Sequence, residues 1–171
     1  TLVHHIEAGN FNKGTAYAVF EGHMKGDFNA YVYKTTDFGS SWTSLVTPDL
    51  TGFARNIQED YENENLLFLG TETGLFITLD GGKNWSKFTN NMPAVAVHFI
   101  DLHKKTNDLV IATHGRGIII IDDNYPKNTN LQWVYTDGRV EKTTVRYPMI
   151  GKGAHVYQHI LHNKTNWKLI G

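Results

Sequence analysis

The chain has 171 residues, 40% of them hydrophobic and 12% aromatic, which is enough apolar material for a sizeable core. Its formal net charge is −1, so no general field draws it to nucleic acid, and no apolar run approaches the length needed for membrane insertion. It contains no cysteine, which excludes disulfides and thiolate metal sites. Because Thr1 starts directly in a strand-like stretch, without Met or a signal peptide, we expect a piece of a longer protein.

The first 46 residues predict four strands. Short apolar runs, rich in β-branched and aromatic residues, alternate there with Gly, Asn and Asp, a pattern typical of strands and turns. The octapeptide TTDFGSSW, residues 35–42, joins the third strand to the fourth. We expect the strands at residues 3–8, 16–20, 30–35 and 42–45.

The same pattern returns in residues 53–89, where the octapeptide TLDGGKNW, residues 78–85, again precedes the fourth strand. The aspartates of the two octapeptides are 43 residues apart. A period of this size indicates one supersecondary unit per repeat, as in propellers and solenoids. In this second unit we expect strands at residues 54–59, 66–70, 75–79 and 85–88.

The two octapeptides share three residue types whose roles we interpret as structural. A short carboxylate at the end of a strand accepts hydrogen bonds from the backbone of its own turn. The glycine supplies positive φ, and the tryptophan starts the next strand as a large apolar anchor. The alternative is that the aspartates are catalytic or bind metal. These residues are Asp37, Gly39 and Trp42 in the first copy, and Asp80, Gly82 and Trp85 in the second.

A third unit follows, because residues 97–123 align without gaps on residues 54–80 and repeat their apolar pattern. Asn124 replaces the first glycine of the octapeptide and no tryptophan follows, so this unit has lost the turn motif. We expect its strands at residues 95–101, 109–113, 118–122 and 131–135.

A fourth unit is expected to begin near the end of the chain, because residues 161–166 repeat residues 102–107 at five of six positions. It would place a first strand at 154–161 and a second at 167–170. The stretch 137–153 fits no part of the repeat, and we interpret it as an insertion or a long hairpin.

We therefore predict an all-β fold: a single partial β-propeller over residues 1–171, built of four-stranded antiparallel blades, with about three and a half blades present. Closed propellers have about four to eight blades. The chain is thus expected to belong to a larger propeller or to form an open arc with exposed edges. The blades are expected at residues 1–46, 53–89 and 95–136, with an incomplete one at 154–171.

The run from Asn65 to Trp85, and the run from Leu109 to Gly117, resemble the BNR or Asp-box repeat propellers. That group includes sortilin-type Vps10 domains and xyloglucanase-like glycosyl hydrolases. The resemblance implies a secreted, periplasmic or cell-surface propeller. The box Ser/Thr-x-Asp-x-Gly-x-x-Trp is specific for the fold and nearly silent on function.

The chain departs from each functional branch of that group. The three arginines with which sialidases hold a sugar carboxylate cannot be placed among the few arginines here. The cysteine-rich module that follows sortilin-type propellers has no counterpart in a chain without cysteine. No aspartate can be matched to the paired acid and base of xyloglucanase-like enzymes, so no catalytic residue is assigned.

Ligand contacts are expected on one face of the propeller. The loops that join second to third strands, and fourth strands to the next first strand, share a face opposite the box turns. The best candidate is His114 with Arg116, a basic pair on a tight glycine turn that can reach a carboxylate or sugar hydroxyls. The alternative is an ordinary turn whose arginine bonds neighbouring carbonyls. The further candidates are Glu72, His23 and Asp27, beside Glu21, Lys25 and Thr73.

Three histidines near the end, His155, His159 and His162, have a spacing that on a helix suggests zinc. The repeat places them instead on a strand and its turn, where His155 and His159 lie about 13 Å apart, at about 3.3 Å per residue. One zinc ion cannot bridge that distance, so we expect no metal and no cofactor.

From the sequence we expect an exported module that binds a glycan or a peptide or protein ligand, or acts as a scaffold, and that is not catalytic in itself. One alternative is the non-catalytic part of a glycoside hydrolase whose acid and base lie elsewhere in the parent protein. A further alternative is an assembly factor for a membrane complex.

Overall fold

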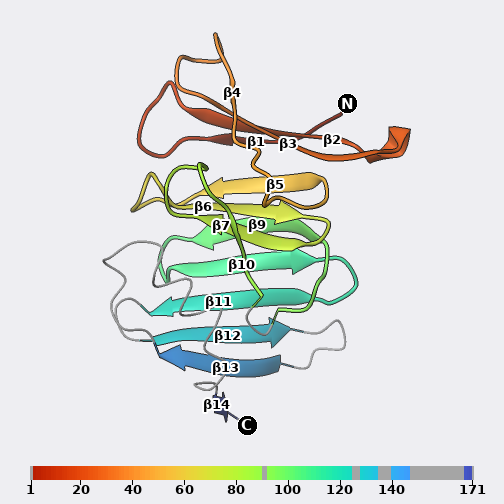
Figure 1. Ribbon diagram of the computed structural model, residues 1–171. Helices are drawn as coiled ribbons and strands as arrows, with labels where there is room; N and C mark the ends of the chain where they lie inside the picture. The colour runs from red at the N-terminus through yellow and green to blue at the C-terminus, as the bar shows by residue number, and fades with distance from the viewer. Residues whose placement is uncertain (1, 90–91, 125–127, 135–139, 147–167, 171) are drawn as a thin grey trace.

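The structure is a computed structural model that describes residues 2–89, 92–124, 128–134, 140–146 and 168–170, with side-chain surroundings as far as residue 121. These residues form three antiparallel sheets, stacked one above the other in Figure 1. The first sheet contains β1 (Leu2–Ala8), β2 (Ala16–Gly22), β3 (Asp27–Thr35) and β4 (Thr43–Ser44), with the short 3-10 helix η1 (His23–Lys25) between β2 and β3. The second contains β5 (Ala54–Glu59), β6 (Leu67–Thr71), β7 (Gly74–Thr78) and β8 (Ser86–Lys87).

The third sheet has six strands in the order β14-β13-β12-β11-β10-β9. Its first four in the chain correspond to the expected third blade. β13 pairs with β12, and β14 pairs with β13 at the outer edge of the sheet. The segment 154–167, with His155, His159 and His162, lies outside the described residues, so the division into blades stays a prediction. The strands are β9 (Val97–His103), β10 (Asp108–Thr113), β11 (Ile118–Asn124), β12 (Asn128–Val134), β13 (Val140–Arg146) and β14 (Lys168–Ile170).

The second sheet is buried on both faces because it lies between the other two. In β6, Leu67 and Leu69 pack into the core shared with the first sheet, whereas Phe68 packs into the core shared with the third. Successive side chains of a strand point to opposite faces. The continuous apolar runs of the second unit therefore reflect a sheet with a core on each side.

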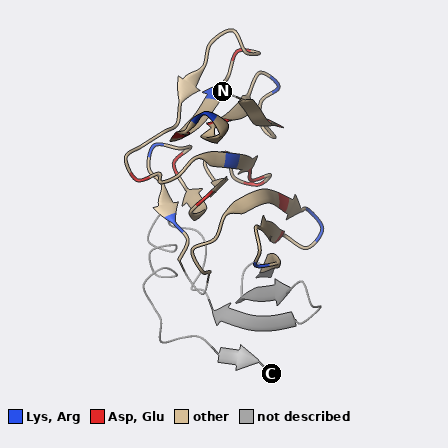
Figure 2. Ribbon diagram, turned by 90° about the vertical axis from the view of Figure 1, so that its right-hand side faces the viewer, with Lys and Arg blue, Asp and Glu red and all other residues tan. Residues whose placement is uncertain are grey.

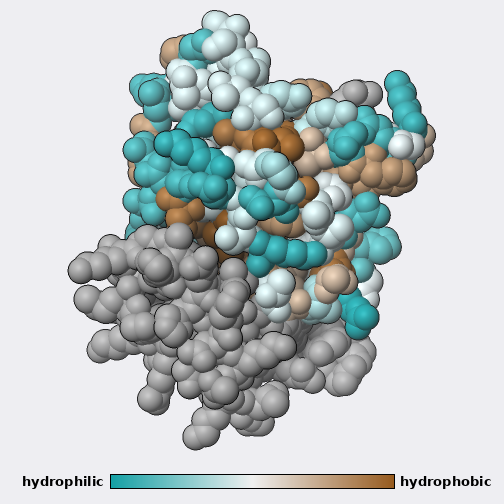
Figure 3. All heavy atoms as spheres, in the orientation of Figure 1, coloured by the Kyte–Doolittle hydropathy of each residue, from teal (hydrophilic) through white to brown (hydrophobic). Residues whose placement is uncertain are grey.

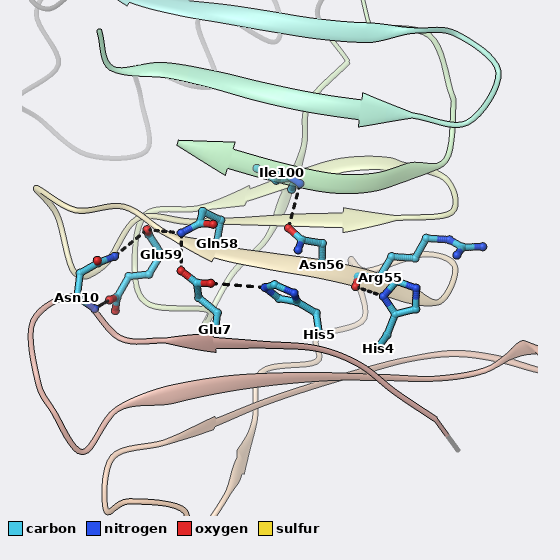
Figure 4. Close-up of polar contacts among 9 residues, drawn as sticks. All are labelled: His4, His5, Glu7, Asn10, Arg55, Asn56, Gln58, Glu59 and Ile100. Atoms are coloured by element: carbon cyan, nitrogen blue, oxygen red, sulfur yellow. Dashed lines mark hydrogen bonds and ion pairs between the residues drawn. The ribbon is translucent and has the colours of Figure 1, made fainter. Parts of the chain in front are cut away.

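The three sheets are also joined by buried polar contacts at their first strands. β5 lies between β1 and β9, and its Asn56 accepts a hydrogen bond from the backbone N–H of Ile100 at 3.1 Å (Figure 4). Towards the end of β5, the buried carboxylate of Glu59 accepts bonds from the Tyr17 hydroxyl at 2.6 Å and from the Asn10 backbone. Burial, and then this bond to Glu59, raise the pKa of Tyr17 far above its usual range. These contacts fix the first and second sheets to each other.

Figure 2 shows acidic and basic residues interspersed along the described part of the chain. Within that part, no helix is long and apolar enough to cross a membrane.

Candidate functional site

The first box turn is closed by its own carboxylate. Asp37 accepts hydrogen bonds from the backbone N–H of Ser41 at 2.8 Å, from the Ser41 hydroxyl at 2.6 Å and from the Thr35 hydroxyl at 2.8 Å. The bonds from Ser41, and then that from Thr35, lower the pKa of Asp37 to about 2. Its carboxylate is therefore occupied within the turn and has little capacity left for a ligand.

The second box turn has the same arrangement. Asp80 accepts bonds from the backbone N–H groups of Lys83 and Asn84, both at 3.0 Å, and from the Thr78 hydroxyl at 2.7 Å. Burial acts to raise the pKa of Asp80, but the bonds from Asn84 and Thr78 outweigh it and the pKa is lowered. Gly39 and Gly82 have φ of 85° and 94°, which a side chain would strain, as these turns require.

The two box tryptophans differ, and one prediction is wrong. Trp85 is only 4% exposed and its indole N–H donates to the Leu45 carbonyl at 2.9 Å. Trp42, which the sequence predicts as an equivalent anchor, is 44% exposed. The difference arises because Trp85 packs on the neighbouring first sheet, whereas no described sheet lies beyond the first sheet to receive Trp42.

The first strands of the three sheets share an irregularity at one end. In β1 the register shifts between Val3 and His5, in β5 between Ala54 and Asn56, and in β9 between Val97 and Phe99. Each shift leaves one extra residue in the first strand, a β-bulge that bends the strand and re-aims a side chain. The extra residues are His4, Arg55 and His98, all of them basic.

Two of these bulged residues meet a buried acid from β2. Glu21, whose side chain is 6% exposed, lies 3.9 Å from His4 Nε2 and 3.7 Å from Arg55 Nη1. His23 of η1 approaches the other carboxylate oxygen at 3.2 Å. His4 Nδ1 also lies 2.5 Å from the Arg55 carbonyl oxygen, and Figure 4 shows both side chains at the same end of β1 and β5. The acid thus joins basic side chains from three elements.

The third bulged residue, His98, stacks on His114 with ring centroids 5.1 Å apart. His114 reaches this place because its backbone N–H bonds to the Ala96 carbonyl, which ties the β10–β11 turn to the start of β9. Burial, and then the charges of Arg55, His114 and His4, lower the pKa of His98. We call the set His4, Glu21, His23, Arg55, His98 and His114 the bulge cluster.

One aromatic side chain packs against two residues of the bulge cluster. Phe53 is buried, His23 stacks on its ring at 4.8 Å, and the Arg55 guanidinium lies 4.7 Å from the ring centroid. Phe28, exposed on β3, meets the same ring at 6.2 Å. Figure 3 shows apolar surface at the tip of the β2–β3 hairpin, at the upper right, where Met24 is 85% exposed. The cluster therefore borders an exposed apolar surface.

The structure places the predicted ligand residues at this end of the sheets, but their surroundings differ. His23 and His114 belong to the bulge cluster, whereas Glu72 and Arg116 are exposed on the neighbouring β6–β7 and β10–β11 turns. Asp27 is engaged in its own hairpin, where it accepts the Tyr31 hydroxyl at 2.7 Å and two donors of Asn29. That bond from Tyr31, and then the backbone of Asn29, lower the pKa of Asp27.

Sequence reasoning missed His4, Arg55 and His98. One signal was available, because the alignment of residues 54–80 on 97–123 sets Arg55 opposite His98. Nothing in the sequence marks a bulge at these positions, so their common orientation needed the structure. Within the described residues, no three His, Asp or Glu side chains are placed to share a metal ion.

The geometry defines a β-propeller arc with hydrogen-bonded turns at one end and the bulge cluster at the other. The sequence matches the family described as sortilin and neurotensin receptor 3 over residues 30–147, more than half of the chain. The chain therefore belongs to the Sortilin-Vps10 family. A search of curated protein sequences found no significant match.

Several solved structures are similar. The GH74 enzyme of Niastella koreensis has 15% identity and a TM-score of 0.57, over 98% of this chain and 30% of its own. YCF48 bound to D1 peptide has 16% identity and a TM-score of 0.49, over 82% and 50%. The GH74 xyloglucanase from Xanthomonas campestris has 8% identity and a TM-score of 0.49, over 94% and 28%. The chain thus spans half or less of the length of each. The predicted all-β partial propeller is confirmed, and at such identity the first likeness shows the fold alone.

Proposed function

We propose that the chain is a recognition module of an exported protein that binds a peptide, protein or glycan ligand at the end carrying the bulge cluster. The observation that supports this proposal is the convergence of three first strands and two inter-strand turns on one buried acid and its basic neighbours. Such convergent polar groups beside apolar surface are typical of ligand sites. The family description names a receptor, which agrees with a binding role.

A non-catalytic role fits the chemistry of this end. Glycoside hydrolysis usually needs two carboxyl groups about 5–10 Å apart across the bond that breaks. The bulge cluster has one carboxylate, Glu21, and it faces three basic side chains. Asp37 and Asp80 lie in turns and are held by their own hydrogen bonds. We therefore propose that any hydrolytic acid and base of the parent protein lie outside this chain.

The proposal extends to context. We propose a secreted, periplasmic or cell-surface location, and a contribution to a larger propeller, because the chain spans a fraction of its structural relatives. No nucleic-acid partner is proposed, since the chain carries a formal net charge of −1.

The test is a binding screen of the purified chain against peptide and glycan libraries, followed by mapping of the contact. We expect Arg116→Ala to weaken binding by about 1–3 kcal/mol if it makes a charged hydrogen bond, with folding little changed because Arg116 is exposed. The matched control is Lys83→Ala, which removes an exposed charge from the second box turn. Ligand crosslinks beside Asp37 or Asp80, or polysaccharide turnover abolished by one carboxylate substitution, would contradict the proposal.

A further inference from the structure

We propose that the bulged residues His4, Arg55 and His98 form one subsite for an oxyanion, a carboxylate, sulfate or phosphate group carried by the ligand. This inference rests on the proposed function and deepens it, because it names the chemistry that the ligand must present. It also assigns that chemistry to residues of the first strands β1, β5 and β9, whereas Arg116 lies on the β10–β11 turn.

The first argument is the repeated geometry. A bulge occurs at the start of β1, β5 and β9, and each bulge inserts one basic residue. In a regular ladder, successive side chains alternate between the two faces of the sheet. The bulge interrupts this alternation and changes the direction of the three basic side chains. The first strands lie next to one another, since β5 packs on β1 and β9, and the His5 ring meets the Phe99 ring at 6.0 Å. Three re-aimed basic side chains therefore share one end of adjacent strands.

The second argument is that Arg55 has hydrogen-bond donors to spare. Its side chain is largely buried, yet Nε has no hydrogen-bond partner, and Nη1 approaches Glu21 at 3.7 Å, beyond hydrogen-bond distance. The guanidinium carbon lies 4.7 Å from the centroid of the Phe53 ring, which is a cation–π contact that favours this position of the side chain. A planar guanidinium presents several N–H groups in the geometry that matches a carboxylate or a phosphate. Arg55 is thus preorganised and only partly satisfied.

The third argument concerns Glu21. One of its carboxylate oxygens is buried without a hydrogen bond, although His4 and Arg55 lie within ion-pair distance of it. A buried charge without close hydrogen bonds is costly unless nearby opposite charge compensates it. We therefore assign Glu21 as the internal counter-ion of the cluster, which competes with a ligand anion for the same cations. Removing its charge is expected to strengthen anion binding.

Proton uptake provides an independent readout. The pKa of His98 is lowered by burial and by the charges of Arg55, His114 and His4, while Glu21 acts in the opposite sense. An anion bound among these groups favours the protonated form of His98, so binding takes up a proton and strengthens as pH falls. The charged or titratable groups that face this region are His4 on β1, Glu21 on β2, His23 on η1, Arg55 on β5 and His114 after β10.

The experiment is an NMR titration of the whole chain, labelled with nitrogen-15, with sodium sulfate at constant ionic strength. Sulfate keeps its charge between about pH 5.5 and about pH 8, so any pH dependence belongs to the protein. We expect saturable shifts at the Arg55 side chain and at the amides around His4 and His98, with tighter binding at the lower pH. Parallel titrations with acetate and phosphate then decide whether the subsite prefers a carboxylate or a tetrahedral oxyanion.

Three variants separate a ligand role from a structural one. Arg55→Gln should weaken binding about tenfold or more. Glu21→Gln should strengthen it, which a merely structural acid would not do. The charge-matched control Lys83→Gln should leave it unchanged. If Arg55→Gln does not fold, Glu21→Gln and His98→Gln carry the test, the second of which should reduce the pH dependence.

Two outcomes would overturn the inference: sulfate, acetate and phosphate all leave the cluster resonances unmoved, or the folded Arg55→Gln chain binds as well as the parent. The failure of the proposed function looks different. If a library ligand binds at this end and is weakened by Arg116→Ala while Arg55→Gln has no effect, the recognition role stands and the oxyanion subsite does not. If no library ligand binds at this end but sulfate binds as inferred, the oxyanion subsite stands and the recognition role does not.

Discussion

The comparison of the two box tryptophans gives a sharp test of how the sheets pack. Trp85→Ala removes an indole that is 96% buried and breaks its hydrogen bond to the Leu45 carbonyl. Large-to-small changes of a buried Trp cost about 3–5 kcal/mol. Trp42→Ala removes a side chain that is 44% exposed, so only about half of that cost applies, which is about 1.5–2.5 kcal/mol.

The assay is thermal and urea unfolding of the two variants beside the parent chain. In a chain of this size, 1 kcal/mol corresponds to a shift in Tm of about 2–4 °C, so Trp85→Ala should lower Tm by about 6–20 °C. A further variant, Trp85→Phe, keeps an aromatic ring but leaves the Leu45 carbonyl without its donor. Its loss of stability, about 1–3 kcal/mol, measures the contribution of the hydrogen bond. Equal losses for Trp42→Ala and Trp85→Ala would falsify the reasoning, because the two residues would then be packed alike.

Further predictions concern the contacts between sheets and the first box turn. Gly70→Ala should destabilise by about 1–3 kcal/mol in urea unfolding, because its Cβ would lie 2.6 Å from Val97 Cγ1; an unchanged midpoint contradicts the close approach of β6 to β9. Tyr17→Phe should cost about 1–3 kcal/mol, because the buried Glu59 loses its hydroxyl donor, and a neutral effect on the midpoint rules this out. The pKa of Asp37 is lowered to about 2, so its stabilisation is present above the ordinary carboxyl pKa and is lost as pH falls towards about 2. The acid branch of the stability–pH curve should accordingly be flatter in Asp37→Asn, and an identical curve shows that the turn bonds do not matter.

Much of the fold could be predicted because its signals are local and repeated. The 43-residue spacing of Asp37 and Asp80 gave the size of the unit, and the apolar runs gave its strands. The burial of the second sheet on both faces also follows from sequence, since Leu67, Phe68 and Leu69 offer no polar face. In these cases the residues of a short segment are enough to predict its structure.

What the sequence could not give depends on neighbours. Trp42 and Trp85 occupy the same position of the repeated octapeptide, yet only Trp85 meets another sheet, so their burial differs. Likewise, Asp27 reads as a free loop acid, but it is held by Tyr31 four residues later in its own hairpin. Burial and hydrogen-bond partners are properties of the assembled sheets, and a repeat predicts only what each unit contributes on its own.

The proposed site places recognition at irregular positions of the fold, and the packing gives a physical reason for this. In the second sheet, regular strand positions are committed to packing, as the complete burial of β6 and β7 shows. The box turns are committed to their own hydrogen bonds through Asp37 and Asp80. Bulges and inter-strand turns are the remaining places where a side chain can change without disturbing core or turn. The bulged residue is histidine in β1, arginine in β5 and histidine again in β9, while the surrounding ladder is retained. A fold that repeats its packing and varies its bulges can therefore alter the ligand that it recognises while each sheet keeps its place in the stack.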